Sequence, residues 1–171
     1  YSAERPLLHF AGAVFAKHGW ATREVHWPEN PPLPEGEDLR PWFDAQEIFV
    51  GSHVSRILDE VTAPEIALVG KSMGSFAAKL AADRTLPAVW LTPILRDSPL
   101  PAHLRRTTSP YLLVGSTADP SWDSEVAHSL GQPVYEDADA DHSMETPADP
   151  VNSADILRHV TAAIDTFVRS L

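Results

Sequence analysis

Residues 66–74 read Ile66-Ala67-Leu68-Val69-Gly70-Lys71-Ser72-Met73-Gly74. The first four are apolar, as in a buried strand, and residues 75–83 favour a helix. Between them lies the pattern Gly-x-Ser-x-Gly, in which two glycines permit a sharp, strained turn from strand to helix. The segment therefore predicts a serine hydroxyl exposed where a strand ends and a helix begins.

Strand and helix patterns alternate along the rest of the chain. Residues 88–91 and 111–114 are continuous apolar runs, typical of parallel strands that helices cover on both faces. Further strands are predicted at 22–27 and 133–136. Four further helices are predicted. The first begins at Pro6 and ends at Gly19, the second runs from Val50 to Val61, and the third spans residues 122–130. The last has an apolar stripe made of Ile156, Val160, Ile164, Phe167 and Leu171.

This alternation predicts an α/β fold with three layers, in which helices cover both faces of a mostly parallel sheet. The 171 residues are enough for one domain, 1–171, with one core. Residues 28–41 hold five prolines and are predicted to form an irregular loop. No internal repeat is visible.

The charge and composition exclude several classes of protein. A net charge of −11 repels phosphate backbones and anionic lipid heads, so we expect neither nucleic-acid binding nor membrane binding. Without cysteine, the chain has no thiolate nucleophile and no disulfide. No apolar stretch has the roughly 18 residues of a membrane span, and residues 1–6 do not resemble a signal peptide. We expect a soluble, cytoplasmic protein.

A serine nucleophile needs a base to take its proton and a group that orients this base. Asp119 lies just past the 111–114 strand, where an orienting carboxylate is expected, and Asp123 is the alternative. His142 lies after the last predicted strand and before the last helix, which suits a base. We interpret Lys71 as a side chain at the surface or the rim of the site, because neighbouring residues at such a turn point apart.

The acidic residues around His142 raise the question of a metal site. Asp137, Asp139 and Asp141 have the spacing that begins an EF-hand calcium loop. The sixth position of that loop is His142 instead of glycine, and the twelfth is Ala148 instead of glutamate. The sequence therefore predicts no metal and no organic cofactor.

The order Ser72, Asp119, His142 resembles that of the α/β-hydrolase superfamily, and the resemblance covers nearly the whole chain. The short connection between the 88–91 and 111–114 strands resembles small members without a cap, of the esterase or dienelactone-hydrolase type. The resemblance implies Ser72 as nucleophile, Asp119 as acid, His142 as base and the Met73 N–H as an oxyanion donor. It also implies a small-molecule ester as the substrate, and the oligomeric state stays open.

The chain departs from the family pattern at its beginning. In the family, a central strand precedes the first helix, and the loop after that strand supplies the second oxyanion N–H. This chain begins in what corresponds to that loop, so we expect one strand of the family sheet to be absent from it. Tyr1 and Ser2 are then expected near the mouth of the site, and Trp122 and Met144 are candidates for its lining.

The residues leave more than one function open. The preferred hypothesis is a serine hydrolase that cleaves a small carboxylic ester through an acyl-enzyme. The same triad would serve a thioester, amide or lactone hydrolase, or an acyltransferase. A non-enzymatic alternative is a catalytically silent member of the same fold that binds another protein.

Overall fold

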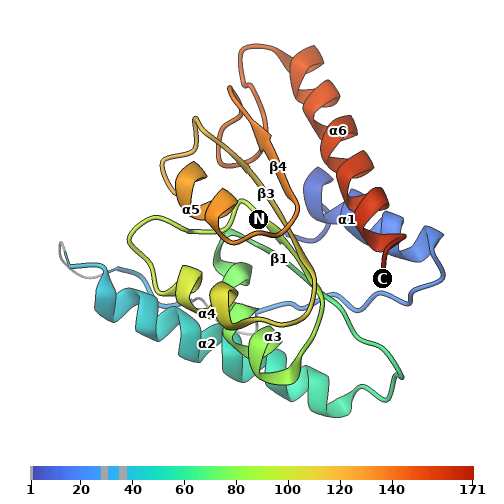
Figure 1. Ribbon diagram of the computed structural model, residues 1–171, viewed down its shortest axis with the longest axis vertical. Coiled ribbons are helices and arrows are strands. Elements are labelled where there is room, and N and C mark those ends of the chain that lie inside the picture. The colour runs from blue at the N-terminus through green and yellow to red at the C-terminus, as the bar shows by residue number, and fades with distance from the viewer. Residues whose placement is uncertain (1, 28–30, 35–37) are drawn as a thin grey trace.

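A computed structural model describes residues 2–27, 31–34 and 38–171. Its centre is a sheet of four parallel strands in the spatial order β1, β2, β3, β4 (Figure 1). Because the strands are parallel, all four carboxyl ends meet at one edge of the sheet, where sites of α/β proteins form. The strands are β1 Leu68–Lys71, β2 Ala88–Leu91, β3 Tyr111–Ser116 and β4 Val134–Asp137.

Helices cover both faces of this sheet, which confirms the predicted three-layer α/β fold (Figure 1). One face carries α1 and α6, which contact each other. The other face carries α2 to α5 and a short 3-10 helix, η1. The helices are α1 Pro6–Lys17, α2 Arg40–Glu60, η1 Ser72–Ala77, α3 Ala78–Arg84, α4 Leu100–Arg106, α5 Ser124–Ser129 and α6 Pro150–Val168.

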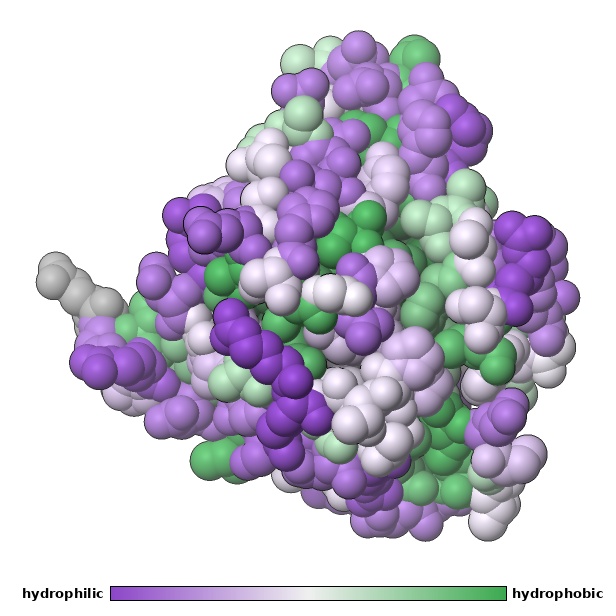
Figure 2. Space-filling view, in the orientation of Figure 1, coloured by the Kyte–Doolittle hydropathy of each residue, from purple (hydrophilic) through white to green (hydrophobic). Residues whose placement is uncertain are grey.

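The central strands β2 and β3 are buried on both sides, as their continuous apolar runs predict. Val89 and Leu91 pack toward α1 and α6, whereas Ala88 and Trp90 pack toward the α2 face. This alternation follows from the period of two along a strand. Figure 2 shows mainly hydrophilic residues on the face turned to the viewer, with hydrophobic residues visible between them.

Three elements differ from the prediction. No strand forms at residues 22–27, where Trp27 packs its ring against Phe49 of α2 instead of pairing with a neighbouring strand. The second helix begins at Arg40, ten residues before Val50, so Pro41, which was expected in a loop, lies in its first turn, where proline is tolerated. Helix α4 lies in the connection between β2 and β3 and was not predicted.

The α1 and α6 helices are joined by a cluster of charged side chains. Asp165 of α6 accepts hydrogen bonds from Lys17 Nζ at 2.6 Å and His18 Nε2 at 2.9 Å. These bonds, together with the charge of Arg169, lower the pKa of Asp165 to about 2.

None of the helices in the described ranges combines the length and the apolar character that a membrane span needs.

Candidate active site

Ser72 follows directly after β1 and begins the 3-10 helix η1. Its φ of 51° lies in the left-handed region, which a residue with a Cβ seldom adopts. The Ser75 hydroxyl donates a 2.6 Å hydrogen bond to the Ser72 carbonyl and holds this turn. A Cβ on Gly70 would lie 2.6 Å from the Gly74 carbonyl oxygen, so the turn needs glycine at position 70.

The Asp119 carboxylate lies just past the carboxyl end of β3 and is fully buried. Its Oδ2 lies 2.7 Å from His142 Nδ1, and its Oδ1 accepts a 2.9 Å hydrogen bond from the Ser121 N–H. Burial by itself raises the pKa of Asp119, but the hydrogen bonds from His142 and Ser121 outweigh it and hold the pKa below its usual value. The carboxylate is therefore ionised at neutral pH.

His142 stands between Ser72 and Asp119, in the loop that joins β4 to α6. Its Nε2 lies 2.8 Å from Ser72 Oγ, and about a third of its side chain is exposed. Because ionised Asp119 can only accept, Nδ1 carries the proton, and Nε2 is free to accept the Ser72 proton. The structure thus brings the three candidate residues into one hydrogen-bonded chain that reaches solvent.

The acidic residues before His142 shape its loop. The Asp137 carboxylate accepts the N–H groups of Asp139 and Ala140 at 2.9 and 3.0 Å. The Asp141 carboxylate accepts the N–H groups of Ser143 and Glu145 at 2.7 and 3.1 Å. These are turn-forming interactions of the kind that aspartate favours. The spacing that resembles a calcium loop therefore serves to fold the backbone that carries His142.

Lys71 does not lie at the surface or rim, contrary to the sequence interpretation. The residue is only 8% exposed, and its Nζ donates a 2.9 Å hydrogen bond to the His142 carbonyl. Burial lowers the pKa of Lys71 to about 8, against the influence of Asp119 and Asp141. The alternation of side chains along a strand could have indicated this burial. Residue 71 lies on the same face of β1 as Val69, whose side chain packs against the α1 and α6 cluster.

Trp122 does not line the site, which corrects the expectation. It is 1% exposed, its ring packs over Gly115 of β3, and its indole N–H donates a 2.6 Å hydrogen bond to Glu136. Only glycine at position 115 leaves room for this ring, since a Cβ there would lie 2.1 Å from it. Trp122 is part of the core on the α2 face.

The other predicted lining residues lie as follows. Met144 is buried in the cluster of α1 and α6 and borders a cavity of about 130 Å³ whose lining includes no member of the Ser72, His142 and Asp119 chain. Ser2 is exposed, and its carbonyl accepts the Arg5 N–H just before α1. Tyr1 lies outside the described residues.

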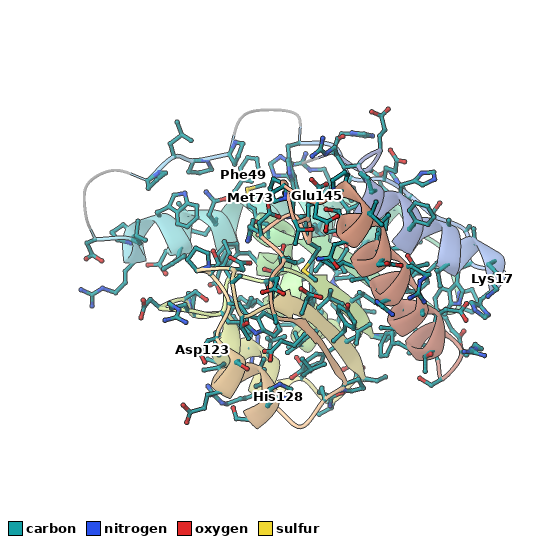
Figure 3. All side chains as sticks on the ribbon, turned by 90° about the horizontal axis from the view of Figure 1, so that it is seen from above. Lys17, Phe49, Met73, Asp123, His128 and Glu145 are labelled. Atoms are coloured by element: carbon teal, nitrogen blue, oxygen red, sulfur yellow. The ribbon has the colours of Figure 1, made fainter. Side chains whose placement is uncertain are left out.

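Met73 and Asp123 occupy different parts of the molecule. Met73 lies in the first turn of η1, where backbone N–H groups have no acceptor within the helix. Asp123 caps α5 by accepting the Val126 N–H at 2.9 Å. Figure 3 labels Asp123 well away from Met73 and from Glu145 of the His142 loop. Asp123 thus serves a helix terminus, and Asp119 is the acid that contacts His142.

Comparison with solved structures places this geometry in a known fold, although no protein-family model and no curated protein matches the sequence. The chain superimposes on an α/β serine hydrolase homologue from Coxiella burnetii, with a TM-score of 0.62, 14% identity, and coverage of 99% of this chain and 78% of that one. A second similar structure is a protein of unknown function from Agrobacterium tumefaciens, provisionally described as an α/β hydrolase. The TM-score is 0.63 and the identity 12%, and the match covers 99% of this chain and 80% of that one.

A third solved structure is the esterase domain of a Rhodothermus marinus protein. It gives a TM-score of 0.50 and 17% identity, with coverage of 71% of this chain and 67% of that one. At these identities the likeness concerns the fold. The parallel sheet, the helical layers on both faces and these three likenesses together show that the chain adopts the α/β-hydrolase fold, in a small form that has no cap domain among residues 2–27, 31–34 and 38–171.

Proposed function

We propose that this protein is a serine hydrolase that cleaves small carboxylic esters through an acyl-enzyme. The observation that carries the proposal is the pair of hydrogen bonds from Ser72 Oγ to His142 Nε2, 2.8 Å, and from His142 Nδ1 to Asp119 Oδ2, 2.7 Å. This arrangement gives a nucleophile, a base and a group that orients the base, in the roles that acyl transfer requires.

The reaction follows from the positions of these groups. Ser72 Oγ attacks the ester carbonyl carbon while His142 Nε2 takes its proton. The oxyanion is expected to accept the Met73 N–H, and buried Asp119 stabilises the imidazolium. His142 then protonates the leaving alcohol as its bond to the acyl carbon breaks. A water then attacks the acyl-serine while His142 takes its proton. The bond between the acyl carbon and Ser72 Oγ breaks, His142 returns the proton to Oγ, and the carboxylic acid leaves.

The shape of the site favours short acyl groups. His142 is partly exposed, Ser72 lies at the sheet edge, and the described residues form no separate cap domain over them. A long acyl chain would gain little from burial at such a surface, because hydrophobic binding energy scales with the apolar area removed from water. The net charge of −11 further favours neutral over anionic esters.

The test is hydrolysis of a series of short p-nitrophenyl esters by the full chain, beside thioester, amide and lactone substrates of matched acyl length. We expect the highest kcat/KM on the short esters. Ser72→Ala should reduce the turnover by about 10⁵- to 10⁶-fold, as removal of the nucleophile does in serine hydrolases. Ser129→Ala, at an exposed position of α5, is the control and should leave the rate unchanged. Equal rates for wild type and Ser72→Ala would overturn the proposal.

A further inference from the structure

Lys71 contacts two parts of the candidate site that lie far apart in the sequence. Its backbone is bonded to Ser72, and its Nζ donates a 2.9 Å hydrogen bond to the His142 carbonyl. Its side chain points to the sheet face that α1 and α6 cover. The Ser72 backbone turns away from the strand direction at the carboxyl edge of the sheet. One residue therefore links the strand that carries the nucleophile to the loop that carries the base.

A lysine is an unfavourable choice for this position. Its side chain is buried at the edge of an apolar cluster, and moving an ammonium group out of water opposes folding. The carboxylates of Asp119, Asp141 and Glu145 favour its charge, whereas the guanidinium of Arg5 opposes it. Buried ionisable groups of this kind cluster at functional sites. At a buried position without a function, an apolar residue gives a more stable protein.

The hydrogen bond closes a ring of contacts around the reacting atoms. The ring runs from Ser72 through the Lys71 side chain to the His142 backbone, and returns from the imidazole to Ser72 Oγ. The start of the same loop is tied to the end of β3, where the Thr117 N–H donates to the Asp137 carbonyl at 2.9 Å. Thr117 thus holds the beginning of the loop, and Lys71 holds the backbone of His142.

We propose that Lys71 is a positioning residue whose amino group anchors the His142 backbone to the Ser72 strand and so sets the distance from Nε2 to Oγ. This inference rests on the proposed hydrolase function. It differs from a Ser-Lys dyad, because Nζ bonds to the His142 carbonyl while Ser72 Oγ bonds to the imidazole. Lys71 thus acts through His142 and does not exchange a proton with the substrate.

The first arm of the test removes the amino group and keeps an unbranched apolar side chain. Lys71→Met should lower kcat on the short esters by about 10- to 100-fold, since a misplacement of about 1 Å has effects of this size. KM should stay close to the wild-type value, because Lys71 does not contact the substrate. Lys79→Met is the matched control: Lys79 is exposed on α3, and its replacement should leave both constants unchanged.

The second arm restores the amino group chemically. Because the chain has no cysteine, Lys71→Cys can be alkylated at one position only, in denaturant, and then refolded beside wild type treated in the same way. Alkylation with 2-bromoethylamine gives a side chain of lysine length with a terminal amine, and alkylation with 1-bromopropane gives the same length without it. We expect the aminoethyl form to regain most of the kcat and the propyl form to stay impaired. Equal activity of the two forms would overturn the proposal.

A third arm does not depend on activity. Hydrogen exchange of peptides covering residues 138–145 should be faster in Lys71→Met than in wild type, and the aminoethylated variant should return it to the wild-type rate. Unchanged exchange would contradict the anchoring role. If the wild type hydrolysed none of the substrates while the exchange still responded to Lys71, the proposed function would fail and the anchor would stand.

Discussion

Ser72 holds its backbone in a conformation that most side chains avoid, and the surrounding turn keeps it there. Its φ of 51° is supported by the hydrogen bond from the Ser75 hydroxyl to the Ser72 carbonyl. Strain of this type has a cost of about 1–3 kcal/mol and collects at functional sites, where it holds a reacting group in place. At the residue scale, the proposed chemistry therefore depends on a serine that is presented rigidly at the end of β1.

The role of Asp119 can be separated from that of its neighbour Asp123. Asp119→Asn keeps the shape of the side chain but removes the charge that fixes the His142 tautomer, so we expect kcat to fall by about 10⁴-fold. Asp123→Asn should leave kcat unchanged and α5 intact, because asparagine caps helices as well as aspartate does. Both are measured by ester hydrolysis, and similar losses in the two variants would contradict the assignment of Asp119.

The burial of Lys71 predicts a pH-dependent effect on stability. Its pKa falls from 10.5 to about 8 on folding, so its buried charge opposes folding below pH 8 by about 3 kcal/mol. Lys71→Met removes this penalty, and the loss of the hydrogen bond to the His142 carbonyl offsets about 1 kcal/mol of the gain. We expect the variant to be more stable than wild type by about 1–2 kcal/mol at pH 7 in urea unfolding, while its activity falls.

The sign of the pH effect follows from proton binding. Between pH 8 and 10.5 the unfolded wild type binds more protons than the folded one, so the contribution of Lys71 to stability rises with pH across this window. The advantage of Lys71→Met should therefore shrink between pH 7 and pH 10. An advantage that stays constant, or a variant less stable than wild type at pH 7, would show that the ammonium is not desolvated as the structure indicates.

At the scale of elements, the junction of β1 and η1 depends on one of its two glycines. A Cβ at Gly70 would meet the Gly74 carbonyl and the Trp90 ring, whereas a Cβ at Gly74 would meet nothing within 4 Å. We expect Gly70→Ala to destabilise the protein by about 1–3 kcal/mol, as overpacking does, and to reduce activity. Gly74→Ala should preserve stability. Urea unfolding of both variants checks this, and equal stability of the pair would contradict the close packing at Gly70.

Asp165 adds charged hydrogen bonds to the apolar packing of α1 against α6. Asp165→Asn should lower the melting temperature at pH 7, because it removes the carboxylate that binds Lys17 and His18. The pKa of Asp165 is lowered, so its contribution is present above pH 3.8 and is lost as the pH falls through about 2. Asp155→Asn, whose partner Arg158 is exposed, is the control and should have no effect. A difference between Asp165→Asn and wild type that persists undiminished near pH 2 would contradict this account.

The elements could be predicted where local pattern and burial agree. The predicted strand 88–91 coincides with β2, because a continuous apolar run suits a strand covered on both faces. The segment 22–27 has charged residues as well as apolar ones and no strand beside it in the described part of the chain, so its backbone does not pair. The beginning of α2 was missed because Gln46 interrupts the apolar stripe, although this side chain is buried and its amide donates to the Pro32 carbonyl.

At the scale of the whole molecule, parallel strands explain why residues distant in the sequence meet. Ser72, Asp119 and His142 lie after β1, β3 and β4, whose carboxyl ends share one edge of the sheet. Their positions could be proposed from the Gly-x-Ser-x-Gly pattern together with the order of the strands. The burial of Trp122 and the hydrogen bond from Lys71 to the His142 carbonyl could not, because both depend on contacts between elements that no local pattern encodes.

The central claim is that Ser72 is an activated nucleophile, and the most direct test is covalent labelling. The intact mass of the full chain is measured after treatment with a fluorophosphonate, for wild type and for Ser72→Ala. The account predicts one adduct on the wild type and none on Ser72→Ala. A folded wild type that forms no adduct, or a Ser72→Ala variant that is labelled equally, would contradict it.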